Sequence, residues 1–323
     1  MQTIKLYTSV PTPRAPFSIS HDDPVLLIGS CFTEAMGLRM RSLGFDVHVN
    51  PFGILYNPIS IGRTLRHCLT DSEIDTSYLV WHDDLWHSWH HHGSFSRSDR
   101  QACLDACNAA IHDAHAFLRR CRTIVFTLGS AYCFSLATQA SRPANTVVDN
   151  APERCKNDLS RVVGNCHKVP EKEFVKTLLS PDEIMEHLGG QVHDLLEAGF
   201  RLVFTVSPVR HGAYGPHGNQ LGKASLLLAV EALFSKSDAH KSQLSYFPAY
   251  EIMVDELRDY RFYADDLIHP SHMAEELIWQ RFQQSHMTEQ TMALCDARER
   301  ENRRAAHRPL REGGRQNYQQ FND

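Results

Sequence analysis

Five short apolar runs alternate with helical patterns along most of the chain, and this alternation limits the possible folds most strongly. The runs are VLLIG, DVHVN, TIVFTLG, RLVFTVSP and LSYF, at residues 25–29, 46–50, 123–129, 201–208 and 244–247. They are rich in β-branched and aromatic residues and are bounded by turn-forming residues, as buried strands are. Strands that alternate with helices form a parallel sheet covered on both faces. The sequence therefore predicts a three-layer, doubly wound α/β fold with a flavodoxin-like, five-stranded parallel sheet.

Helix signals fill the intervals between these runs. Helical patterns cover about 32–43, 98–120, 219–236, 249–260 and 271–285, and two more helices begin at Asn57-Pro58 and Ser180-Pro181. In both pairs a capping side chain precedes a proline at the first helical position. Two long stretches, about 70–97 and 130–170, show no obvious strand. We expect them to lie over the carboxyl ends of the strands, where ligands bind in this class of fold.

The pattern predicts one domain over residues 1–285. The remaining segment, 286–323, is highly polar, and we expect it to begin as a helix and to become disordered toward its glycines.

The composition indicates which binding partners and which cellular compartment to expect. The net charge is −5 and no basic run is present, so we expect no nucleic-acid partner. The apolar runs are too short to insert in a membrane. The N-terminus has no signal-peptide pattern and the nine cysteines are scattered, which indicates a cytoplasmic protein with reduced thiols. The oligomeric state stays open.

The first chemical motif is VLLIGSCFTEAM, at residues 25–36. A buried strand ends at Gly29-Ser30 and a helix starts at once, so Ser30 lies at a helix N-terminus that favours an anion. Ser30 is the candidate nucleophile, and the alternative is a simple helix cap with Glu34 in the first turn. Cys31 competes as a nucleophile, but we expect it to pack behind the turn.

The second chemical motif is FYADDLIHPSH, at residues 262–272. Asp266 can accept the Nδ1 proton of His269 and leave Nε2 free to take a proton from a nucleophile. The alternative is an ordinary capped loop before a helix at Ser271. The Asp266–His269 motif is a more specific signal when it occurs together with the strand–Gly–Ser–helix motif near the other end of the chain.

These two motifs resemble the first and last conserved blocks of SGNH/GDSL hydrolases, and in more detail the chain is similar to the GSCFA family. The resemblance covers about residues 20–285, with Thr33 where the family name has Ala. Further matching stretches are NPFGILYNP, TLGSAY, NCHKVP, TVSPVRH and YFPAYEIMVDELRDYRFYADDLIHPS. The resemblance implies a Ser30–His269–Asp266 triad and leaves the substrate open.

The resemblance also implies an oxyanion hole. Gly53 matches the glycine that follows the second strand in SGNH enzymes, whereas Ser130 follows the third strand where an asparagine is usual. Asn165 is our substitute donor, with a turn-forming role as the alternative. Arg210 and His211 follow the fourth strand and are candidates for binding an anionic substrate, with a loop salt bridge as the alternative.

A histidine-rich stretch, WHDDLWHSWHHHG at 81–93, has two interpretations. Its histidines and aspartates could hold zinc or iron, but the spacing matches no known site. We favour an aromatic lid or wall over the site, with no metal and no other cofactor.

The predicted function is hydrolysis of an acyl or acetyl ester through a covalent serine intermediate. A saccharide that carries the ester group is one candidate substrate. A small-molecule or saccharide ester is the expected partner. An O-acyltransferase would use the same triad with a sugar hydroxyl in place of water. A non-catalytic ligand-binding module and a metal-dependent hydrolase are alternatives from other classes.

Overall fold

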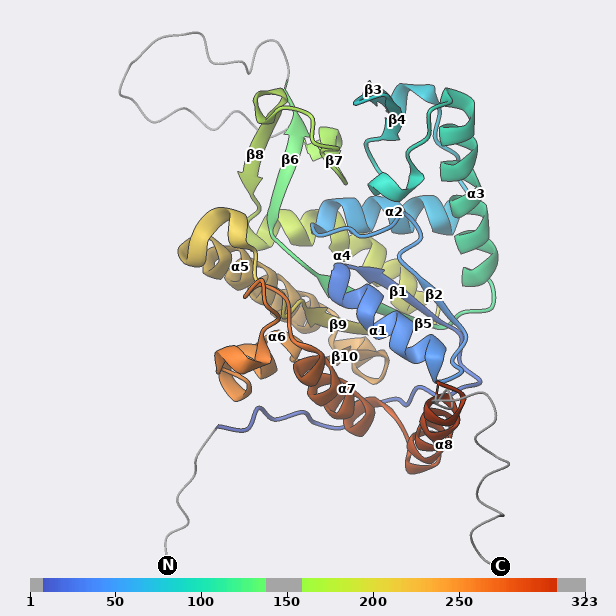
Figure 1. Ribbon diagram of the computed structural model, residues 1–323, viewed down its shortest axis with the longest axis vertical. Helices are drawn as coiled ribbons and strands as arrows, with labels where there is room; N and C mark the ends of the chain where they lie inside the picture. The colour runs from blue at the N-terminus through green and yellow to red at the C-terminus, as the bar shows by residue number, and fades with distance from the viewer. Residues whose placement is uncertain (1–7, 138–158, 307–323) are drawn as a thin grey trace, which may run out of the picture.

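The five predicted strands form one parallel sheet in the computed structural model, which describes residues 8–137 and 159–306 (Figure 1). They are β1 (Val25–Gly29), β2 (Val47–Val49), β5 (Thr123–Leu128), β9 (Arg201–Val206) and β10 (Leu244–Tyr246). Their spatial order is β10-β9-β5-β1-β2, and all neighbours are parallel. This flavodoxin-like order confirms the predicted doubly wound fold.

Helices cover both faces of the sheet, which explains why β1 and β5 are buried along their whole length. One layer holds α2 (Pro58–Thr70), α3 (Arg100–Leu118), α4 (Pro181–Glu197) and α5 (Gly215–Lys236). The other holds α1 (Cys31–Ser42), the short α6 (Ala249–Glu251), α7 (His272–His286) and α8 (Glu289–Ala306). Alternate residues of β1 serve the two cores, with Leu26 and Ile28 on the first side and Val25 and Leu27 on the second.

The predicted capping residues form hydrogen bonds at the first turns of α2 and α4. The Asn57 side chain accepts the Ser60 N–H at 2.8 Å and starts α2. Ser180 and Glu183 form a reciprocal capping box at the start of α4, with Pro181 at the first helical position.

The two stretches that we expected to lack strands contain short ones, so that expectation was wrong. Strands β3 (Leu79–His82) and β4 (Leu85–Ser88) pair as a hairpin, and β6 (Tyr132–Leu136) lies between β7 (Val162–Val163) and β8 (Phe174–Leu178), which comes just after the second stretch. These strands are short and most are partly exposed, so they have no continuous apolar run to mark them. Residues 138–158 of the second stretch lie outside the described residues.

The polar C-terminal segment begins with α8, which packs Cys295 into the core beside α1. Arg39 of α1 contacts Glu276 of α7 at 2.8 Å and Glu299 of α8 at 3.2 Å. The expectation of a disordered end concerns 307–323, which lie outside the described residues. Within the described part of the chain, no helix has the length and apolar character needed to cross a membrane.

Candidate functional site

A tight turn joins β1 to α1 at the carboxyl edge of the sheet. Gly29 has a φ of +146°, and a Cβ atom there would lie 2.1 Å from the carbonyl oxygen of Thr127 in β5. The Gly29 N–H donates to Asn50 Oδ1 at 2.8 Å, and the Ser30 N–H donates to the Thr127 carbonyl at 3.3 Å. The start of α1 is therefore held against β5 and the end of β2.

Ser30 occupies the N-cap position of α1, but its side chain makes no capping hydrogen bond. Its hydroxyl donates instead to Ser207 Oγ, just after β9, at 3.0 Å. Ser30 is 1% exposed. Among the described residues no hydrogen bond joins Ser30 to His269, so this conformation ties β1 to β9 rather than forming the predicted serine–histidine contact.

Asp266 and His269 are in direct contact on the loop before α7. His269 Nδ1 lies 2.6 Å from Asp266 Oδ2, and the other carboxylate oxygen accepts the N–H groups of Ile268 and His269 at 2.9 Å each. The His269 N–H is the largest cause that lowers the pKa of Asp266 to about 2. An ionised carboxylate at Nδ1 keeps the proton there and leaves Nε2 as an acceptor.

The Cys31 thiol is the group that faces Nε2 of His269, at a Sγ–Nε2 distance of 3.4 Å. The expectation that Cys31 packs behind the turn was therefore wrong. Cys31 is the first residue of α1, and this position directs its side chain to the 266–269 loop, whereas Ser30 turns inward. Burial is the largest cause that raises the pKa of the Cys31 thiol, and N–H groups at the helix start oppose it.

Lys223 of α5 is a residue of the candidate site that sequence reasoning missed. It is only 2% exposed, and Nζ donates to the carbonyls of Gly129 at 2.8 Å and Ser207 at 2.7 Å. Burial lowers its pKa to about 7. The signal was a lysine inside the otherwise small and apolar run GKASLLLAV, which places a charge on the buried side of a helix.

The two residues predicted to form the oxyanion hole, Gly53 and Asn165, make hydrogen bonds within local turns. Gly53 has a φ of +78°, and its N–H donates to the Asn50 carbonyl at 2.7 Å, within a tight turn. Asn165 accepts the His167 N–H on its side-chain oxygen at 2.8 Å, which is a turn as well. No hydrogen bond among the described residues joins Asn165 to Ser30 or Cys31.

Arg210 and His211 lie after β9, near the loop that carries His269. The Arg210 guanidinium stacks 4.0 Å from the Tyr263 ring centre, and the backbone N–H of Arg210 donates to the Ile268 carbonyl at 3.1 Å. Arg210 therefore supports the 266–269 loop. The His211 N–H donates to Asn219 Oδ1, while its buried Nε2 has no hydrogen-bond partner among the described residues.

Side chains of the histidine-rich stretch contact one another and neighbouring segments. His87 contacts Ser96 Oγ and the His82 carbonyl at 2.6 and 2.9 Å, and His91 stacks 3.9 Å from the Phe52 ring. A hollow of about 320 Å³ lies beside α1, and its lining includes Glu34, Asn50, Gly53, His92 and Ser94. The C-terminal end of the stretch therefore forms a wall next to the helix that carries Cys31.

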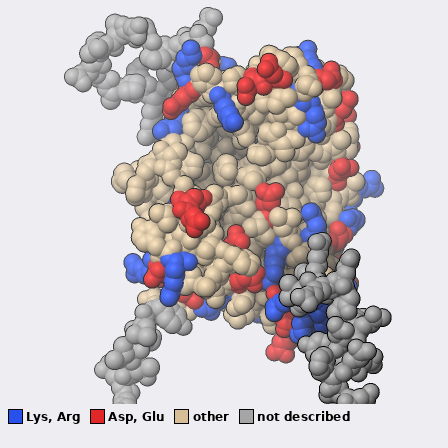
Figure 2. All heavy atoms as spheres, in the orientation of Figure 1, with Lys and Arg blue, Asp and Glu red and all other residues tan. Residues whose placement is uncertain are grey.

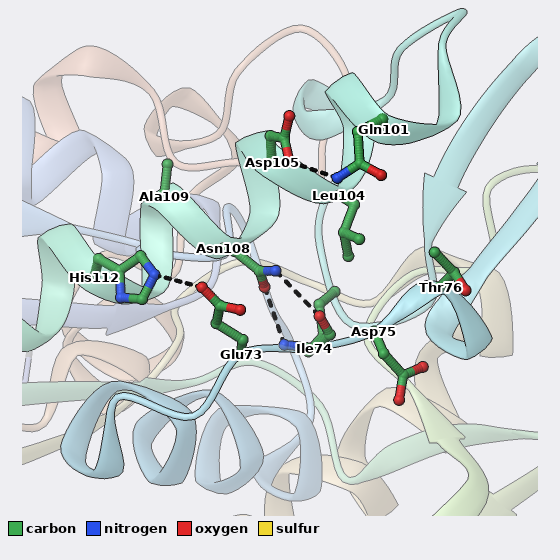
Figure 3. Close-up of a pocket in the computed structure, with 10 residues that line it drawn as sticks. All are labelled: Glu73, Ile74, Asp75, Thr76, Gln101, Leu104, Asp105, Asn108, Ala109 and His112. Atoms are coloured by element: carbon green, nitrogen blue, oxygen red, sulfur yellow. Dashed lines mark hydrogen bonds and ion pairs between the residues drawn. The ribbon is translucent and has the colours of Figure 1, made fainter.

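A larger surface hollow, of about 530 Å³, lies beside α3, away from the turn at Ser30 (Figure 3). Its polar groups contact one another. His112 reaches Glu73 at 2.8 Å, and Asn108 bonds both the N–H and the carbonyl of Ile74. These contacts fasten the 71–76 segment to α3, which is a structural role.

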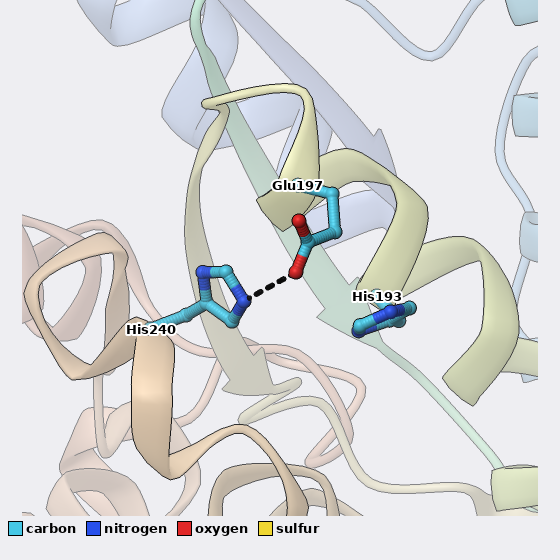
Figure 4. A group of neighbouring side chains, drawn as sticks. All are labelled: His193, Glu197 and His240. Atoms are coloured by element: carbon cyan, nitrogen blue, oxygen red, sulfur yellow. Dashed lines mark hydrogen bonds and ion pairs between the residues drawn. The ribbon is translucent and has the colours of Figure 1, made fainter.

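His193, Glu197 and His240 present ligand atoms within 4.8 Å of one another (Figure 4). They lie just before β9 and β10 begin, at the opposite sheet edge from Cys31. Both ring nitrogens of His240 already face side-chain oxygens, those of Glu197 and Gln243, at 3.0 Å. This arrangement suits a hydrogen-bonded surface cluster, and we assign it no metal.

On the face seen in Figure 2, acidic and basic side chains of the described residues are interspersed, and a hollow opens among uncharged ones.

The strand order and the Asp266–His269 pair at the carboxyl edge define a doubly wound α/β protein with a candidate acid–base pair. The GSCFA family model matches residues 24–282, and the chain belongs to that family. This confirms the resemblance seen in the sequence.

Two solved structures are similar to the chain at 10% sequence identity. One is a protein assigned as an acylhydrolase from Bacteroides fragilis, with a TM-score of 0.38 and coverage of 84% of this chain and 89% of that one. The other is a GDSL-like lipase from Bacteroides thetaiotaomicron, with a TM-score of 0.35 and coverage of 81% and 87%. No curated protein matches the chain.

Proposed function

We propose that this protein is an acyl hydrolase that cleaves an acyl or acetyl ester through a covalent intermediate. The observation that carries the proposal is the 2.6 Å contact between His269 Nδ1 and Asp266, with Nε2 directed at the first residue of α1. A histidine oriented by a carboxylate and facing a nucleophile is the arrangement that acyl transfer requires.

In this mechanism Asp266 holds the imidazole in one tautomer, and His269 takes the proton of a nucleophile at the Ser30–Cys31 turn. Ser30 is the nucleophile expected from the sequence, and it would have to leave Ser207 to reach Nε2. His269 then returns the proton to the leaving alcohol and activates water. A saccharide ester is a suitable substrate class, and a sugar hydroxyl in place of water would give O-acyl transfer.

Turnover of p-nitrophenyl acetate and of acetylated saccharides tests this function. We expect His269→Ala to lower kcat/KM by at least about a thousandfold, because the nucleophile loses its base. The control is His272→Ala, since His272 is an exposed histidine three residues further on and should stay within about twofold of wild type. Undiminished turnover in His269→Ala would refute the proposed role of the pair.

A further inference from the structure

Two nucleophilic side chains, on adjacent residues, lie in different surroundings at the turn into α1. The Ser30 hydroxyl is buried and donates to Ser207 at 3.0 Å. The Cys31 thiol is half-buried, and its sulfur lies 3.4 Å from the free nitrogen of the Asp266–His269 pair. Sulfur accepts and donates hydrogen bonds at longer distances than oxygen, so 3.4 Å is a direct contact.

We propose that Cys31, and not Ser30, is the nucleophile, so that the site is a Cys31–His269–Asp266 triad that forms a thioester intermediate. This inference rests on the proposed function, because it keeps the same base and the same class of substrate. Ser30 is then a positioning residue that ties the end of β1 to Ser207 after β9.

A buried lysine supports an anion at this position when it is protonated, independently of the histidine contact. Lys223 lies within electrostatic range of Cys31, where its charge favours the thiolate. No carboxylate among the described residues forms an ion pair with Lys223, whose Nζ is held by the carbonyls of Gly129 and Ser207. Buried charges normally have a counter-charge. A thiolate or oxyanion formed during the reaction would supply it.

The N-terminus of α1 also favours the thiolate form of Cys31. The N–H groups of Cys31 and Phe32 stabilise a thiolate, and the Ser30 side chain does not cap the helix and compete for them. Burial is nevertheless the largest influence and keeps the resting group a thiol. Cys31 therefore needs His269 as a base at the moment of attack, as a serine would.

The reaction balances without a further reactant. His269 Nε2 takes the thiol proton while Sγ bonds to the ester carbonyl carbon, which gives a tetrahedral oxyanion. The oxyanion collapses, the C–O bond to the alcohol breaks, and His269 protonates the leaving oxygen. Water then gives a proton to His269 and attacks the thioester, and the proton returns to sulfur as the carboxylic acid leaves.

Trapping the acyl intermediate distinguishes the two nucleophiles. Wild type, Ser30→Ala and Cys31→Ala would be mixed with p-nitrophenyl acetate, quenched in acid, and analysed by intact mass and peptide mapping. We expect an acetyl adduct on Cys31 in wild type and Ser30→Ala, removed by neutral hydroxylamine as a thioester is. Cys31→Ala should lack the adduct and lose at least about a thousandfold in turnover.

Cys166→Ala is the matched control, because Cys166 is also half-buried and burial raises the pKa of its thiol to about 11. It should keep both the adduct and the turnover. Alkylation by iodoacetamide adds a second readout, since His269→Ala should slow modification of Cys31 but not of Cys166.

Three outcomes would overturn the inference. Turnover retained in Cys31→Ala excludes the thiol as nucleophile. An adduct that maps to Ser30, lost in a Ser30→Ala variant that unfolds at the wild-type temperature, restores the serine mechanism and leaves the proposed function intact. Absence of turnover and adduct in folded wild type, on both p-nitrophenyl and saccharide esters, removes the proposed function and the thiol triad together.

Discussion

Lys223 is a lysine that is only 2% exposed and whose ammonium group contacts two backbone carbonyls. An ammonium group without water is costly, and two backbone carbonyls compensate it only in part. The same two contacts join the end of β5 to the end of β9, next to the Ser30–Ser207 hydrogen bond. A group that is costly to bury and lies beside candidate nucleophiles is typical of a functional site.

The pH dependence of stability should reveal this lysine. Its folded pKa of about 7 is below the unfolded value of 10.5, so between these values the unfolded chain binds a proton that the folded chain does not. The contribution of Lys223 to the free energy of unfolding should therefore rise from pH 7 to pH 10, by up to about 1.4 kcal/mol per pH unit. Lys223→Met should remove this rise in urea unfolding measured at pH 7 and pH 9.

Lys236→Met is the matched control for that experiment, because Lys236 is an exposed lysine in the last turn of the same helix. It should keep the wild-type pH profile. Identical profiles for Lys223→Met and wild type would show that the lysine is not desolvated in solution.

At the scale of elements, the β1–α1 turn sets the position of both candidate nucleophiles. Gly29→Ala should therefore destabilise the protein by at least about 2 kcal/mol, since its Cβ atom would meet the Thr127 carbonyl oxygen and the φ of +146° is strained for alanine. Chemical denaturation checks this. Gly190→Ala, in an open helical position of α4, should be neutral or slightly stabilising. Equal stability of the two variants would contradict the close approach.

The main elements were predictable because each has a local signal. The central strands are apolar on both faces, and the starts of α2 and α4 carry capping side chains. The outer strands, such as β6, were missed because they are short and partly exposed. The thiol's direction was missed for another reason. It depends on a contact between residues 238 positions apart, which no local pattern encodes.

At the scale of the whole molecule, buried neutral histidines make the fold sensitive to acid. Burial lowers the pKa of His91 to about 3, and those of His167 and His286 to about 4. Below the unfolded pKa of 6.5 the unfolded chain takes up protons that these folded side chains do not. The free energy of unfolding should therefore fall steadily between pH 6.5 and pH 4.

His286→Gln tests this dependence, because glutamine can still bond the Ser245 hydroxyl, as His286 does at 2.9 Å, but cannot be protonated. Urea unfolding at pH 7 and pH 5 should show a smaller loss of stability in this variant than in wild type. His217→Gln, at an exposed position, should behave as wild type. An unchanged loss in His286→Gln would mean that His286 is protonated within the folded protein.

The separation between Cys31 and His269 has a consequence for how the protein is made. The ribosome delivers the strand and helix that carry the thiol more than two hundred residues before the imidazole that faces it. During that interval Cys31 has no partner base, and β1 lacks β5 as a neighbour until residue 123 is reached. If Cys31 depends on His269 as we propose, the thiol of a nascent chain gains its base only after all five strands of the central sheet have been synthesised, since β10 ends at Tyr246.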